Sequence, residues 1–252
     1  MVFSRKITQE EFEWHNKLIA EFCQLQYHGN PVDIKAIGSG NFKAVYKVEL
    51  PTRTFVAAAS SHSRKEKLVN EYSVLHTLYD ACPDLYPEPI AHYKSNDLDG
   101  DVMITEYLRH KDLTEPHDKT LVKSFDRRIA FLLGYNSALV NLRTSLYSED
   151  PHDGNIMIQI TPNAQGVPVD SPNRGKIDMK FCDAGMYVQG GIEEMVYSIL
   201  INPNDRQECT RFINQFRDGI ATAIVEETGV DFLKAAKQLN YLNNYTGTLK
   251  EF

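Results

Sequence analysis

Apolar residues near the start of the chain recur at the three- and four-residue spacing of one helix face. Thr8 precedes this pattern, with Glu11 three residues later, which is the arrangement of a capping box. The Gly-Asn-Pro run at residues 29–31 stops it. A helix is therefore predicted between Thr8 and this stop, with an apolar face formed by Phe12, Ile19, Phe22 and Leu25.

Short segments with β-branched or aromatic residues follow, separated by turns that contain glycine or proline. These predicted strands cover residues 33–38, 44–50 and 53–60. Helical spacing returns over residues 63–79, and a proline-rich break then leads to residues 101–108, which are typical of a buried strand. This part of the chain is predicted to be β-rich around one helix.

The second half of the chain is predicted to be mainly helical around a small hairpin. A long helix is expected over residues 119–146, and the hairpin strands over 154–160 and 176–183. Mostly helical sequence follows Gly191. The order of elements predicts an α+β protein with a β-rich N-lobe and an α-helical C-lobe. The expected divisions are an N-terminal helix (1–30), an N-lobe (31–108) and a C-lobe (109–252).

Composition narrows the function classes. The 252 residues are 42% hydrophobic, which is enough for a sizeable core, and the net charge of -7 argues against binding to nucleic acid or an anionic membrane. The four cysteines are scattered, as in a reduced protein. Neither a signal-peptide core nor a run of 18 apolar residues is present. We expect a cytoplasmic monomer or weak dimer, in the host cytoplasm if the protein is viral.

Three polar motifs carry candidate chemistry. The two glycines of "IGSGNFKAVYKV" (37–48) expose backbone N–H groups that suit phosphate oxygens, although taken alone the motif fits an ordinary glycine-containing hairpin better. Asp183 in "FCDAG" ends an apolar strand, where it could hold Mg²⁺ or form an Asx turn. In "EDPHDGN" (149–155), Asp150 could orient or deprotonate a hydroxyl and Asn155 could hold a metal, whereas Asp153-Gly154 could be a hairpin turn.

Taken in order, these motifs resemble the signature set of the protein-kinase-like superfamily. The resemblance covers roughly residues 33–191. The D-x-H-x-G-N pattern of residues 150–155 is closer to that of small protein kinases of T7-like phages and of aminoglycoside and choline kinases than to the pattern of eukaryotic protein kinases. It implies a two-lobed fold with a trimmed C-lobe, and ATP and Mg²⁺ as cofactors. It implies that Asp150 is the catalytic base, that Asn155 and Asp183 are metal ligands, and that Glu71 is the helix acid of the lysine–glutamate pair. His152 is either a phosphate or substrate contact or a solvated loop residue.

The resemblance also implies where ATP binds. Thr105 would be the gatekeeper, and the strand that ends at Leu108 would be the hinge whose backbone groups read adenine. The remaining expected nucleotide contacts come from the glycine-rich segment and the strands around it. The full set is Gly38, Ser39, Gly40, Asn41, Phe42, Val45, Ala57, Thr105, Glu106 and Leu108.

The sequence departs from the family where a lysine should stand on the third strand. That lysine neutralises the α- and β-phosphates and pairs with the helix acid, but by motif Ala59 holds its position. Glu71 is therefore expected to have no cationic partner, and phosphotransfer to be very low. Natural loss is one explanation, and replacement of the charge by Lys43 or Lys47 is another. Deliberate substitution of a lysine is a third, favoured because Asp150, Asn155 and Asp183 are all retained.

Other departures affect the expected function. No His-Arg pair precedes Asp150, and no Ala-Pro-Glu follows the "DAG" segment, so activation-loop control is not expected. The primary prediction is a Ser/Thr protein kinase that acts on a protein substrate. A small-molecule kinase is an alternative, weakly disfavoured by the mixed charges of the C-terminal part. A pseudokinase that binds a partner is the third possibility.

Overall fold

The computed structural model describes residues 6–40, 42–60, 65–112, 126–150, 153–162, 175–201, 213–231 and 234–235. The chain divides into two compact units. The first consists of residues 1–109 together with 183–185, and the second of residues 110–182 and 186–252. The fold is α+β, with a five-stranded antiparallel sheet in the first unit and helices in both.

The first helix, α1 (Gln9–Tyr27), has the N-terminal capping box that the sequence predicts. The Thr8 side chain accepts a hydrogen bond from the Glu11 backbone N–H, and the Glu11 side chain accepts one from the Thr8 backbone in return. The helix ends at His28, which adopts the left-handed conformation with φ 53°. The predicted helix is confirmed.

The sheet of the first unit has the strand order β1-β2-β3-β5-β4. Its strands are β1 (Asp33–Ser39), β2 (Lys43–Leu50), β3 (Arg53–Ser60), β4 (Pro89–Lys94) and β5 (Asp101–Glu106). The sequence pattern missed β4, because its first residue is a proline in a proline-rich segment. A proline at the start of an edge strand donates no ladder hydrogen bond and breaks none, which is why β4 lies at the edge. Strand β5 ends at Glu106, two residues before the predicted end at Leu108.

Helix α1 covers one face of this sheet. Its buried side chains, including Leu18 and Phe22, pack with alternate residues of β2, β3 and β5 in a single core cluster. Gly100 makes the close approach possible, since a Cβ atom there would lie 2.4 Å from the Trp14 ring. Members of this cluster on the sheet are Ala44, Tyr46, Val48, Leu50, Phe55, Ala57, Ala59, Val102 and Ile104.

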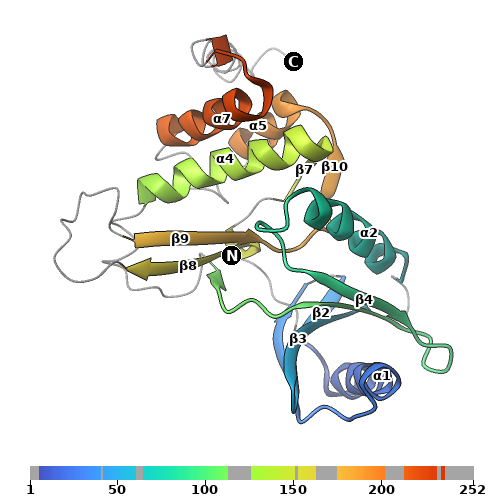
Figure 1. Ribbon diagram of the computed structural model, residues 1–252. Coiled ribbons are helices and arrows are strands. Elements are labelled where there is room, and N and C mark those ends of the chain that lie inside the picture. Colours follow the sequence, from blue (N-terminus) through green and yellow to red (C-terminus); the bar gives the residue numbers. More distant parts are fainter. Residues whose placement is uncertain are drawn as a thin grey trace. The chain divides into compact units, whose positions relative to one another are not determined.

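Helix α2 (Lys65–Ala81) lies on the opposite face of the sheet from α1 (Figure 1). The Tyr72 ring packs against His92 of β4, with ring centroids 5.9 Å apart. His92 is the cross-strand partner of Met103, so both side chains are on the face that α2 covers. The first unit is therefore a three-layer α/β/α arrangement, with α1 on one face of the sheet and α2 on the other.

In the second unit, helix α4 (Asp126–Thr144) lies between α7 (Ile213–Thr228) and the hairpin of β8 (Ile156–Pro162) and β9 (Gly175–Phe181) (Figure 1). The predicted strand pair is confirmed, with Ile156 opposite Phe181. The described part of this unit also contains shorter elements: β6 (Lys111–Asp112), β7 (Leu146–Ser148), a 3₁₀ turn (Asp153–Asn155), β10 (Tyr187–Gln189) and α5 (Ile192–Ile201).

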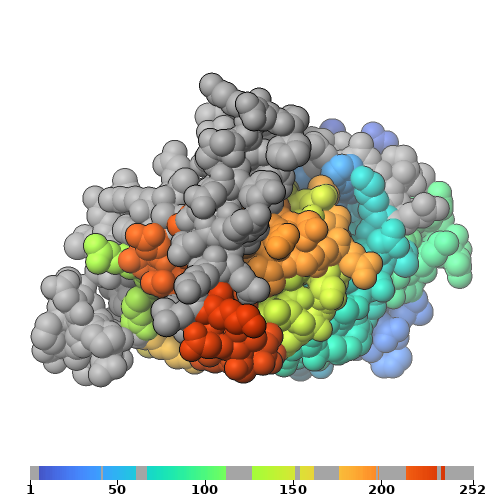
Figure 2. Space-filling view, turned by 90° about the horizontal axis from the view of Figure 1, so that it is seen from above, coloured from blue at the N-terminus to red at the C-terminus, as the bar shows by residue number. Residues whose placement is uncertain are grey.

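Two glycines bring α4 and α7 into direct backbone contact. A Cβ atom on Gly134 would lie 1.9 Å from the Phe216 carbonyl oxygen, and one on Gly219 would lie 2.1 Å from that of Phe131. Figure 2 shows the red part of α7 at the surface beside the yellow-green part of α4. An Arg143–Glu227 ion pair joins the same two helices.

None of the helices in the described ranges is long and apolar enough to cross a membrane. Residues 163–174, between the two predicted hairpin strands, lie outside the described residues, as do residues 119–125 of the expected long helix.

Candidate functional site

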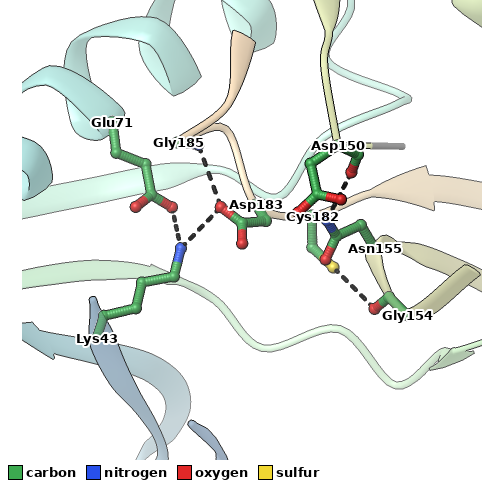
Figure 3. Close-up of polar contacts among 8 residues, drawn as sticks. All are labelled: Lys43, Glu71, Asp150, Gly154, Asn155, Cys182, Asp183 and Gly185. Carbon is green, nitrogen blue, oxygen red and sulfur yellow. Dashed lines mark hydrogen bonds and ion pairs between the residues drawn. The ribbon is translucent and has the colours of Figure 1, made fainter. Parts of the chain in front are cut away.

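Lys43, Glu71 and Asp183 form a partly buried charge cluster in the first unit (Figure 3). The Lys43 ammonium forms an ion pair with the Glu71 carboxylate and lies 3.0 Å from Oδ1 of Asp183. The Glu71 side chain is only 6% exposed, that of Lys43 15%, and that of Asp183 35%. The expectation that Glu71 has no cationic partner is wrong, because Lys43 fills that role.

Lys43 reaches this position from the first residue of β2, directly after the glycine-containing turn. The Gly40 N–H donates a 2.9 Å hydrogen bond to the Lys43 carbonyl oxygen, which closes the turn. The β1–β2 register shifts between Ala36 and Gly38, so the strand is irregular just before the turn. Alternation along β2 puts Ala44 in the α1 core and directs Lys43 to the α2 face, where Glu71 lies.

Asp183 has an unusual backbone conformation that directs its carboxylate into the cluster. Its φ is 66°, the left-handed region, which asparagine and aspartate enter more readily than other side chains. Its Oδ1 accepts a 3.1 Å hydrogen bond from the Gly185 N–H, which is an Asx-type turn. The two alternatives for this motif are therefore compatible, since the turn itself holds the carboxylate against Lys43.

Gly185 lies close to both carboxylates of the cluster. A Cβ atom at this residue would lie 3.2 Å from Oδ1 of Asp183 and 3.3 Å from Oε2 of Glu71. Both distances are shorter than ordinary carbon–oxygen contacts, so a side chain would push one carboxylate away. Because Gly185 has no side chain, the Asp183 and Glu71 carboxylates can both lie beside the Lys43 ammonium.

The electrostatics of the cluster follow from its burial. Burial alone would lower the pKa of Lys43, but the Glu71 and Asp183 carboxylates outweigh it and raise the pKa above its ordinary value. Burial raises the pKa of Glu71, and Lys43 opposes that shift. Lys43 is therefore charged at neutral pH, and one ammonium serves two carboxylates. Such a cluster carries a net negative charge when both acids are ionised, which favours an added cation.

The packing of β3 corrects two predicted site residues. Ala59 and Ala57 are completely buried in the cluster that faces α1, on the opposite side of the sheet from Glu71. A lysine at residue 59 would begin on the wrong face, and Ala57 has no access to the α2 face. A one-residue shift along a strand exchanges its faces, so the residue after Ala59 is the one on the α2 side.

Ser60, rather than Ala59, is the β3 residue beside the cluster. It is the cross-strand partner of Lys43, and directly opposed residues share a face. On this face lie Lys43, Val45 and Lys47 of β2, Val56, Ala58 and Ser60 of β3, and Met103 and Thr105 of β5. Lys47, the other candidate cation, instead pairs with Glu49 and lies 5.0 Å from the centre of the Tyr107 ring.

The predicted nucleotide contacts are only partly gathered on this face. Val45 and Thr105 are on it, and Thr105 is 7% exposed. Gly38, Ser39, Gly40 and Phe42 belong to the β1–β2 hairpin and its turn. Glu106, the last residue of β5, donates its backbone N–H to the Glu88 carbonyl oxygen. Leu108 lies two residues further on, outside any regular element. Asn41 lies outside the described residues.

The catalytic-loop candidates belong to the second unit. Asn155 Nδ2 donates a 3.1 Å hydrogen bond to the Asp150 carbonyl oxygen, so the two residues of the motif are held together. The Asn155 carbonyl accepts from the Cys182 N–H at 2.9 Å, which ties the start of β8 to the end of β9. The donor in this bond is the NH₂ group, so the bond leaves the separate Asn155 side-chain oxygen to act as an acceptor or ligand. His152 lies outside the described residues.

The start of this loop is positioned by β7 and β10. The two strands pair antiparallel, with Tyr187 opposite Ser148, and the Glu149 N–H donates to the Met186 carbonyl at 2.9 Å. Asn141, which is buried, donates from its side chain to the carbonyl oxygens of Leu146 and Gly190. A buried amide with two backbone acceptors fixes the geometry of the segment that leads to Asp150.

The oxygen donors of these motifs suit Mg²⁺. Carboxylate and amide oxygens are its preferred ligands, and it usually binds through one or two carboxylates together with substrate phosphates. Within the described residues, no group of three or more His, Cys, Asp or Glu side chains could hold a metal by itself. Taken separately, the Asp183 carboxylate of the first unit and the Asn155 amide oxygen of the second are ligand types that Mg²⁺ accepts.

Comparison with family models gives no match, and a search of curated proteins finds no similar sequence.

Proposed function

We propose that the chain is an ATP-dependent phosphotransferase with a two-lobed protein-kinase-like fold, in which the first unit is the N-lobe and the second is the trimmed C-lobe. Its substrate class is a serine or threonine hydroxyl of a protein. The observation that carries the proposal is the ion pair of Lys43 with Glu71 and Asp183. It supplies the phosphate-neutralising cation of this reaction class from β2, so the alanine at residue 59 is no obstacle.

The proposed reaction assigns each charged residue one task. An acceptor oxygen forms a bond to the γ-phosphorus while the bond from that phosphorus to the β,γ-bridging oxygen breaks, leaving ADP. Asp150 orients the hydroxyl and takes its proton. Lys43 offsets charge on the α- and β-phosphates, and Glu71 holds the Lys43 ammonium. Mg²⁺, held by Asp183 and Asn155, would offset charge on the phosphate tail.

The location follows the cysteine chemistry. The four cysteines are scattered along the chain without a closely spaced pair. Such a pattern fits a reducing compartment, so we propose that the protein acts in the cytoplasm.

The test is phosphate transfer from γ-labelled ATP to proteins of a cell lysate and to the chain itself. Lys43→Met should lower kcat about 100- to 1000-fold, because the charge is needed where the transition state develops. Lys47→Met is the matched control and should stay close to wild type, since Lys47 pairs with Glu49. Equal activity of the two variants would overturn the assignment of Lys43.

Nucleotide binding separates the metal ligand from the base. Asp183→Ala should weaken binding of Mg·ATP more than Asp150→Ala, because a metal ligand acts in the ground state and a base acts mainly in the transition state. Calorimetric titration measures both. Labelling of small molecules alone would favour the small-molecule kinase, and binding without turnover would favour the pseudokinase. Neither binding nor turnover would overturn the proposal.

A further inference from the structure

A second contact joins the glycine-containing turn to helix α2. The Lys67 ammonium lies 3.6 Å from the centre of the Phe42 ring, a cation–π geometry. Phe42 is adjacent to Lys43 in sequence, and Lys67 is four residues before Glu71 on α2. Residues four apart on a helix share a face, so both contacts involve the same face of α2 and the same end of the hairpin.

The two contacts differ in which element supplies the cation. The turn supplies the cation Lys43 to an acid of the helix, and the helix supplies the cation Lys67 to a ring of the turn. We call this pair of contacts the turn–helix latch. A single ion pair allows the hairpin to pivot about one point, whereas two contacts from adjacent residues restrain its orientation as well.

Lys43 needs such a restraint because of its place in the sheet. The paired residues of β1 and β2 end at Ser39 and Ala44, so Lys43 lies beyond the last of them. Its cross-strand partner Ser60 lies beyond the last β3–β5 pair, Ala59 with Val102. Lys43 is thus at the tip of a two-stranded end of the sheet, where strand pairing alone holds a side chain less firmly.

We propose that Phe42 and Lys67 are positioning residues, which keep the turn on α2 and so hold Lys43 at Glu71. This inference rests on the proposed function, in which the placed Lys43 ammonium binds the phosphates. Phe42 then acts through Lys67 and the turn, which differs from a direct contact with the nucleotide. Removing either partner of the cation–π contact should have the same effect.

The latch itself is tested without any ligand, by hydrogen exchange of the amides of residues 38–44. Phe42→Ala and Lys67→Met should each increase exchange in this segment. Lys35→Met removes a positive charge from an exposed position on the same hairpin and should leave the exchange unchanged. Phe42→Trp keeps an aromatic face for the cation and should restore the protection. Unchanged exchange in both latch variants would overturn the proposal.

The functional arm measures the Kd of Mg·ATP. Each latch variant should bind about three- to tenfold more weakly than wild type, the range expected for an exposed to partly buried cation–π contact. The double variant should lose no more than the weaker-binding single variant, because both remove the same contact. A Kd equal to that of Lys35→Met in both variants would overturn the positioning role and leave the proposed function intact. No nucleotide binding by the wild-type chain would overturn both.

Discussion

The Nζ atom of Lys43 lies 3.0 Å from Oδ1 of Asp183, although the two residues are 140 positions apart in the chain. Lys43 begins β2, whereas Asp183 follows β9, and Glu71 of α2 completes the group. The carboxylate thought to lack a partner is therefore the most buried member of an ion-pair cluster. A sheet register and an Asx turn assemble this cluster from three separate segments.

The cross-strand pairing of Lys43 with Ser60 predicts that the cation can be moved between strands. Lys43→Met combined with Ser60→Lys should recover much of the phosphotransfer that Lys43→Met alone removes. The lysine at residue 60 starts on the same face as Glu71, one strand away. Steady-state kinetics on the single and double variants measure the recovery.

The matched control for this exchange is Lys43→Met with Ala59→Lys. Residue 59 is completely buried against α1, so the new ammonium would be placed in an apolar core without a carboxylate. This variant should be inactive and less stable. Recovery with the lysine at residue 59, and none at residue 60, would show that the assigned strand faces are wrong.

Gly185→Ala should impair nucleotide binding more than folding. The new methyl group would lie 3.2 to 3.3 Å from the oxygens of Asp183 and Glu71, so one carboxylate must move away from Lys43. Side chains can yield where backbone cannot, and the predicted loss of stability is about 1 kcal/mol. Titration with Mg·ATP measures the affinity and urea unfolding measures the stability, and the affinity should show the larger effect. Unchanged affinity would mean that the cluster tolerates expansion.

The contact between α4 and α7 predicts a strong requirement for glycine at two helix positions. Gly134→Ala or Gly219→Ala should destabilise the protein by about 3 kcal/mol, although alanine favours helices. The added methyl group would meet a backbone carbonyl oxygen of the other helix at 1.9 or 2.1 Å, which only separation of the helices can relieve. Ser137→Ala in the same helix is the control for helix propensity. Thermal or urea unfolding measures the stability of each variant. Stabilisation by either glycine substitution would contradict the close packing of α4 and α7.

The thiol of Cys23 predicts a loss of stability at alkaline pH. Burial in the α1 core raises its pKa from 9.0 to about 11. Below pH 9 both folded and unfolded states hold the proton, and between pH 9 and 11 mainly the unfolded state releases it. Stability therefore falls as the pH rises through this window.

The variant Cys23→Ala isolates this contribution. Between pH 8 and pH 10 its free energy of unfolding should fall by about 1 kcal/mol less than that of the wild type. Loss of the sulfur from the core lowers the stability at both pH values and cancels in the comparison. Parallel pH profiles for the two proteins would contradict the raised pKa.

The sequence by itself determined most of the regular elements. Capping residues and apolar spacing located α1, and alternating strand patterns with turn residues located β1, β2, β3 and the β8–β9 pair. These signals are local, because a capping box or a strand period lies within a few residues of chain. The edge strand β4 escaped because its proline start weakens the local signal, although such a proline is acceptable at an edge.

Only the tertiary structure decided which cation meets Glu71. A shift of one residue along β3 changes whether Ala59 or Ser60 is assigned to the face that α2 covers. The run of alanines carries no local signal that distinguishes the two assignments. Lys43 and Lys47 start on the same face of β2 and are both close to the motif in sequence, and Lys47 pairs with Glu49. The sheet register, the ion pair with Glu71 of α2 and the left-handed turn at Asp183 select Lys43 of the two. These are long-range constraints, because each depends on segments that meet only when the chain is folded.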